Sequence, residues 1–161
     1  MTEQQFWKLI GLLDWKKQGN DNAVVRPLVK ALAELSEKEI FAFDDWLAEK
    51  LHALDTEAHA RNVGEYSYEG PDEFFSVDSF LYSRCVVVVN GKQFFGQVLA
   101  KPKWFPKDME FESILYVAST AYEKKTGKEY PHSPATSYET FSNKKGWRSA
   151  RKKRRPKRAR K

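Results

Sequence analysis

The stretch CVVVVNGKQFFGQVLA, residues 85–100, constrains the fold of this chain more than any other part of it. Four consecutive valines, an Asn-Gly pair and two aromatic residues form the pattern of a β-hairpin over residues 84–96. The same residues suit a buried helix that ends at Asn90 and Gly91 in the left-handed conformation, followed by a second helix over residues 92–100. An isolated hairpin is only marginally stable, and we find no third strand in the sequence. We therefore predict two helices here and keep the hairpin as the alternative.

Helix starts are marked elsewhere by short-range polar signals. Thr2 followed by Gln5, and Ser36 followed by Glu39, have the spacing of a capping box, in which each pair satisfies the free amides of a first helical turn. After Ser36, apolar residues recur every three or four positions, as on the buried face of an amphipathic helix. Pro27 suits the first turn of a helix better than its interior, so we predict that the second helix is kinked or restarted there.

Together these patterns predict an all-α fold: a single-domain helical bundle of about five to six helices with a disordered basic C-terminal tail. We divide the chain into a helical domain at residues 1–131, an extended strap or linker at 132–147, and a disordered Lys/Arg-rich tail at 148–161. The strap is rich in Pro, Ser and Thr without periodicity, whereas the tail carries too much like charge to fold alone.

The net charge of +6 conceals two oppositely charged parts. Residues 144–161 contain 12 of the 28 Lys and Arg and none of the 22 Asp and Glu, so residues 1–143 carry a net charge of about −6. A block of like charge typically binds a partner of the opposite charge. The chain is therefore expected to consist of an acidic body and a basic arm.

The density of positive charge in the arm favours binding to DNA or RNA. Each Lys or Arg on a phosphate releases counterions, and nothing in the arm reads base edges, so binding should be independent of sequence. Trp147 and the arginines can also stack on unpaired bases. The predicted nucleic-acid-binding residues are Lys144, Lys145, Trp147, Arg148, Arg151, Lys152, Lys153, Arg154, Arg155, Lys157, Arg158, Arg160 and Lys161.

Other interpretations of the charge pattern stay open. The tail can be solvated and serve solubility alone. Alternatively, the chain is an immunity- or antitoxin-type protein that neutralises a protein partner through its acidic helical body. In a eukaryotic source, RKKRRPKR would fit a nuclear localisation signal.

Titratable residues give little indication of an enzyme. Cys85 would need His52, His59 or His132 as a base to act as a nucleophile, but a cysteine in an apolar run is typically a buried core residue. His52 and His59 lie seven residues apart, with no acidic residue at a spacing that would complete a metal site. There is no phosphate-binding loop and no hydrolase signature. We expect no catalytic residue, no bound metal and no cofactor.

Acidic residues gather before the apolar run, where they form either a general acid–base pair or a cation site, or simply solvated loop and cap residues. We favour the solvated interpretation for these four acids, Glu69, Asp72, Glu73 and Asp78. Asp78 and Arg84 are expected to take part in buried ion pairing that orients helices.

The start of the chain lacks the basic head and apolar stretch of a signal peptide, and no run approaches 18 apolar residues. A single cysteine leaves no internal disulfide. These features predict a soluble cytoplasmic protein without membrane contact, associated with the nucleoid in a bacterium or located in the nucleus of a eukaryote.

Several motifs taken together resemble the uncharacterised bacterial domain-of-unknown-function 4240 (DUF4240) family over roughly residues 2–131. They are QFWKLI, then Asp78, Phe80 and Arg84 ahead of CVVVV and Gly91, then FFGQVLAKP, and finally ESILYVASTAYEKKTG as the last helix. The resemblance implies an all-α bundle and no particular activity. It assigns structural roles to Phe6, Trp7, Asp78, Phe80, Arg84, Gly91, Pro102 and Tyr122. Lys103 follows Pro102 where members of the family usually have Asp, and the basic tail lies outside the resemblance.

Overall fold

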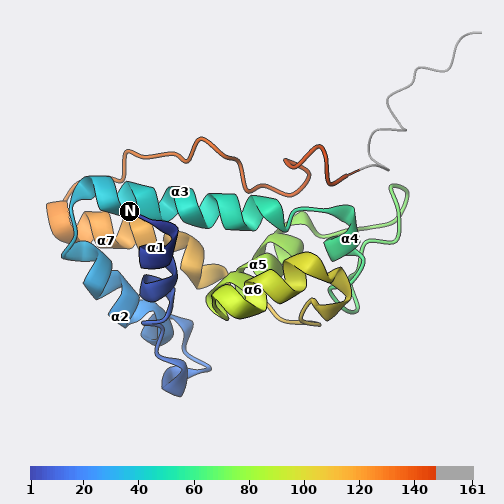
Figure 1. Cartoon of the computed structure of the whole chain (residues 1–161), viewed down its shortest axis with the longest axis horizontal. Coiled ribbons are helices and arrows are strands. Elements are labelled where there is room, and N and C mark those ends of the chain that lie inside the picture. Colours follow the sequence, from blue (N-terminus) through green and yellow to red (C-terminus); the bar gives the residue numbers. More distant parts are fainter. Residues whose placement is uncertain (148–161) are drawn as a thin grey trace, which may run out of the picture.

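The computed structural model describes residues 1–147, which form an all-α body without a β-strand in that range (Figure 1). Its α-helices are α1 (Glu3–Ile10), α2 (Asp21–Ala33), α3 (Glu37–Ala53), α4 (Glu57–Ala60), α5 (Val77–Val89), α6 (Lys92–Ala100) and α7 (Val117–Thr126). Three short 3-10 helices join them: η1 (Trp15–Lys17), η2 (Pro102–Trp104) and η3 (Glu112–Tyr116). The all-α prediction is confirmed. The described part has one more α-helix than the upper prediction because α4 is a single turn without a periodic apolar pattern. Residues 148–161, the predicted tail, lie outside the described residues.

The longest helix, α3, runs through the length of the body (Figure 1). Near its N-terminal half lie α1, α2 and α7, and α2 packs most extensively against α7. Near its C-terminal half lie α5 and α6, with α4 at the end (Figure 1). Residues 128–147 contain no helix, and the strap, residues 132–147, runs along α3 and also reaches α5, where the Thr140 hydroxyl donates to the Val77 carbonyl. The strap thus returns the chain to the end of the body where α4 lies.

The predicted helix starts are confirmed at both capping boxes. Gln5 donates its amide to the Thr2 hydroxyl while its side chain accepts from the Thr2 amide, and Ser36 and Glu39 repeat this arrangement. The helix does not restart at Pro27, because Asn20 caps α2 by accepting from the Ala23 amide and so starts the helix six residues upstream. Pro27 therefore lies in the helix interior, where its ring is exposed to solvent.

The apolar run forms a helix, α5, and not a hairpin. Nine of its residues are buried: Phe80, Leu81, Ser83, Arg84, Cys85, Val86, Val87, Val88 and Val89. A helix that is apolar around its circumference is stable only inside the body, and this burial outweighs the low helix propensity of valine. Asn90 ends the helix without a left-handed conformation. Gly91 has a φ of +92° and is the N-cap of α6. The Asn90 side-chain amide donates to the Val86 carbonyl and satisfies one of the free carbonyls of the last turn.

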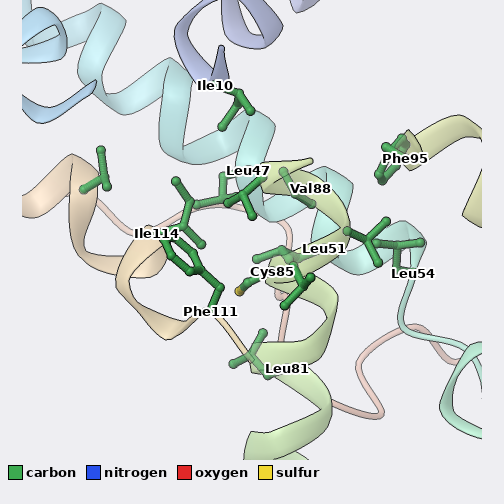
Figure 2. Close-up of a cluster of buried hydrophobic side chains, with 14 of the residues drawn as sticks. Ile10, Leu47, Leu51, Leu54, Leu81, Cys85, Val88, Phe95, Phe111 and Ile114 are labelled. Carbon is green, nitrogen blue, oxygen red and sulfur yellow. The ribbon is translucent and has the colours of Figure 1, made fainter. Parts of the chain in front are cut away.

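The core lies where α5 crosses α3. Figure 2 shows Cys85 and Val88 of α5 among Leu47 and Leu51 of α3, with Ile114 of η3 close by. All of these side chains are at most 1% exposed. This apolar centre fixes α3 and α5 relative to each other and hence positions the polar residues at their ends.

Candidate functional site

One buried carboxylate, that of Asp55, holds the C-terminal part of the strap against the body. Asp55 follows α3 and is fully buried. Its Oδ1 accepts hydrogen bonds from the Phe141 amide (3.1 Å) and from Trp147 Nε1 (2.8 Å). Its Oδ2 accepts from the Asn143 amide (2.9 Å) and from the Ser142 hydroxyl (3.3 Å). Since a buried carboxylate is costly unless donors surround it, these bonds make Asp55 the fixed point of the strap.

The last described residue, Trp147, is part of the core. It is 1% exposed, and its ring lies 4.4 to 6.2 Å, centroid to centroid, from those of Tyr68, Phe75, Phe80 and Phe141. The residue before it is pressed against α4: the Gly146 carbonyl accepts from the Glu57 amide, and a Cβ on Gly146 would lie 2.8 Å from Thr56. The chain is therefore fixed to the body up to Trp147.

This position corrects the prediction that Trp147 stacks on an unpaired base. Neither face of a ring buried to this extent is open to a base, because Asp55 and four aromatic rings hold it inside the body. The two lysines that precede it, Lys144 and Lys145, are exposed as a nucleic-acid contact requires. The other predicted nucleic-acid-binding residues lie outside the described residues: Arg148, Arg151, Lys152, Lys153, Arg154, Arg155, Lys157, Arg158, Arg160 and Lys161.

A second buried charge, that of Arg84 on α5, lies beneath the same strap. Arg84 is 0% exposed, and its Nη1 donates to the carbonyls of Leu51 and Tyr138, each at 2.9 Å. Its Nη2 donates to the Thr140 hydroxyl at 3.0 Å, whereas Nε has no hydrogen-bond partner within residues 1–147. Burial lowers the pKa of Arg84, and the nearby negative charge of Asp55 opposes that effect. Two of the three acceptors to which Arg84 donates thus belong to the strap.

Within the described residues, neither Asp78 nor Arg84 forms the expected buried ion pair. Asp78 is exposed in the first turn of α5, where a negative charge interacts favourably with the helix dipole, and no salt bridge within the described range joins it to Arg84.

The remaining family-motif residues have structural positions. Phe6, Trp7, Phe80 and Tyr122 are buried, Gly91 supplies the positive φ between α5 and α6, and Pro102 begins η2.

Cys85 and the three histidines do not form a nucleophile–base pair. Burial raises the pKa of the Cys85 thiol to about 12. The His59 ring accepts from the Thr56 hydroxyl at 2.7 Å and donates to the Val98 carbonyl at 3.1 Å. His52 contacts the Ser137 carbonyl at 2.8 Å, and His132 Nε2 lies 2.8 Å from Asp45 Oδ1. Each imidazole is therefore held by a partner other than the thiol.

Other candidate sites within residues 1–147 offer less. The four acids singled out in the sequence, Glu69, Asp72, Glu73 and Asp78, are all exposed. No group of three or more His, Cys, Asp or Glu in this range could hold a metal ion, and no helix in it is both long and apolar enough to span a membrane. A pocket of about 480 Å³ beside η1 is lined by Trp15, Phe111 and Met109 together with Asp21 and Glu110, but by no cation that would attract an anion.

Sequence reasoning missed two residues of this region. Asp55 follows a helix and precedes Thr56, a pattern typical of any helix boundary, and nothing local indicates donors some 90 residues away. Trp104 is 48% exposed in the loop KPKWFPK, where three lysines surround it. That composition is the signal that could have identified Trp104 as a surface residue suited to a polyanion.

A family model described as "Protein of unknown function (DUF4240)" matches residues 1–124 of the chain. Comparison with curated proteins and with solved structures gives no match. The match ends in α7, so both the strap and the basic tail lie beyond it.

Proposed function

Because the chain belongs to the DUF4240 family of proteins of unknown function, its role must be argued from its own residues, and we propose that it is a binding protein, not an enzyme. Its ligand is nucleic acid, DNA or RNA, held without sequence specificity by the basic tail, residues 148–161. Ten of these fourteen residues are Lys or Arg and none is acidic. A segment of this composition neutralises phosphates along a backbone and has no means of reading bases.

The observation that carries the proposal is the burial of Trp147 at the point where the tail begins. Trp147 is 1% exposed and hydrogen-bonded to Asp55, so the tail starts from a fixed place beside α4. Lys144 and Lys145 are exposed immediately before it and extend the positive charge onto the body. A nucleic acid bound by the tail is thereby kept next to one particular face of the helical body.

Salt dependence tests the proposal quantitatively. Each phosphate contact with duplex DNA contributes a slope of about −0.9 to the logarithm of affinity against the logarithm of salt concentration. If about six tail residues bind phosphates, the slope of the full-length protein should be roughly −5. Fluorescence anisotropy with a labelled duplex at several salt concentrations measures this slope.

The decisive variant keeps the chain length and removes five tail charges by changing Arg151, Lys152, Lys153, Arg154 and Arg155 to Gln. Its slope should be smaller in magnitude by up to about 4 to 5, because up to five phosphate contacts are lost.

The matched control removes the same amount of charge from the body. Five exposed lysines near the N-terminal end serve for this purpose: Lys8, Lys16, Lys17, Lys30 and Lys38, each changed to Gln. This control should keep a slope close to that of the unchanged protein. An equal reduction in both variants would mean that net charge alone governs binding, and an unchanged slope in the tail variant would refute the tail as the binding element.

A further inference from the structure

The body itself carries a surface suited to nucleic acid, centred on η2. No acidic residue occurs between Asp78 and Asp108, and the exposed lysines of this stretch that surround η2 are Lys101, Lys103 and Lys107. The overall negative charge of residues 1–143 is therefore unevenly distributed along the chain.

Trp104 lies in the middle of these lysines with its ring partly in solvent. Pro102 begins η2, and the next residue after the turn, Phe105, is 2% exposed and packs near the rings of Phe80 and His59. With Phe105 held in the core, its neighbour Trp104 faces outward and is 48% exposed. Lys101 Nζ lies 5.0 Å from the Trp104 ring centroid, within the range of a cation–π contact. We call Lys101, Lys103, Trp104 and Lys107 the Trp104 platform.

The Trp104 platform and the end of the described chain at Trp147 both adjoin the same short helix, α4. The Glu57 amide of α4 donates to the Gly146 carbonyl, one residue before Trp147. His59 of α4 donates to the Val98 carbonyl of α6, and η2 packs against α4. The rings of Phe105 and Trp147 both lie about 6 Å from that of Phe80. A nucleic-acid strand bound by the tail is consequently able to contact the platform.

Two acidic groups near the platform, those of Glu57 and Asp108, are engaged with other partners. Glu57 accepts two hydrogen bonds from the Arg61 guanidinium, at 3.0 and 2.7 Å. Asp108 accepts from the Glu65 amide at 2.7 Å. These contacts reduce the repulsion that a phosphate would meet beside Lys103 and Lys107.

We propose that the Trp104 platform stacks an unpaired base on the Trp104 ring while Lys101, Lys103 and Lys107 contact the flanking phosphates. This inference rests on the proposed function, because the tail brings the polynucleotide to the body. A base inside a duplex already stacks on its neighbours, so the platform strengthens binding to single strands alone. The protein therefore prefers single-stranded DNA or RNA to a duplex, a preference that the tail cannot supply. Stacking on an aromatic ring does not depend on base identity, so binding stays independent of sequence.

The test compares Trp104→Ala with Trp15→Ala in the full-length protein. Trp15 is a suitable control because it is exposed to a similar extent, 41%, but lies in η1 next to Phe111, away from η2. Each variant is titrated with labelled oligo(dT), oligo(U) and a duplex of equal length. Trp104→Ala should weaken binding to both single strands about 5- to 150-fold, the range found for loss of one aromatic stack, and change duplex binding less than about twofold. Trp15→Ala should change neither.

A second variant, Trp104→Phe, keeps an aromatic face and should bind single strands with an affinity between those of the unchanged protein and Trp104→Ala. Circular dichroism confirms that each variant is folded. Equal losses on duplex and single strand, or no loss on single strands, would overturn the inference while leaving the tail proposal intact. Failure of the tail proposal itself gives a different result, namely an unchanged salt slope after removal of the five tail charges.

Discussion

Replacing Asp55 with Asn should release the strap from the body, and the structure allows the cost to be estimated. Asn keeps one acceptor oxygen in place of two, so it can retain either the pair of bonds from Phe141 and Trp147 or the pair from Ser142 and Asn143. The new side-chain amide would then face two donors. Hydrogen bonds to a charged group contribute about 1.5–3 kcal/mol each, so the loss of two lowers the free energy of unfolding by about 3–6 kcal/mol.

Urea unfolding, followed by tryptophan fluorescence and by circular dichroism, measures this change. Asp45→Asn is the matched control, because the Asp45 side chain is 45% exposed and its salt bridge is with the half-buried His132 in the strap. That substitution should cost less than about 1 kcal/mol. The reasoning is refuted if Asp55→Asn unfolds at the same urea concentration as the unchanged protein, with the same dependence on urea and the same native tryptophan emission.

Two further predictions concern buried titratable groups. Burial holds the pKa of His59 below its ordinary value, so unfolding takes up a proton as the pH falls below about 6.5. The free energy of unfolding should therefore decline by up to about 2 kcal/mol between pH 6.5 and 5. His59→Gln should flatten this decline in urea titrations at successive pH values. If the free energy of unfolding depends on pH in the same way in His59→Gln and in the unchanged protein, the decline does not come from His59. Because the pKa of the Cys85 thiol is raised to about 12, a disulfide reagent at pH 8 should label Cys85 no faster than the protein unfolds, and immediate labelling in native buffer would show an accessible thiol.

The parts of the fold that the sequence predicts are those that depend on neighbours along the chain. Thr2 with Gln5 and Ser36 with Glu39 identify two helix starts, because each capping box closes within four residues. The choice of helix over hairpin at α5 needed one global argument, the absence of further strands. Pro27 was placed in a first turn because the preference of proline was applied without the cap at Asn20, which starts α2 six residues earlier.

The candidate site depends on contacts that no local pattern reveals. Asp55 meets its donors 86 to 92 residues later in the chain, and Arg84 meets Tyr138 and Thr140 54 and 56 residues later. The Lys/Arg-rich ending drew attention to Trp147 as an exposed stacking residue, whereas one hydrogen bond to Asp55 and four ring contacts place it inside the body. Charge along the sequence supports the proposed class of ligand, whereas burial decides which tryptophans are open to a ligand.

The dependence of Arg84 on the strap has a consequence for biosynthesis. A ribosome makes α5 with its guanidinium long before it makes Tyr138 and Thr140, and a buried charge without partners strongly disfavours compaction. At about 5–20 residues per second, the interval between polymerising residues 84 and 147 lasts about 3–13 s. Throughout that interval Arg84 and Asp55 lack the partners that the strap supplies, so final closure of the body waits until residue 147 has been made, and chaperones and proteases have access to the nascent helices before then.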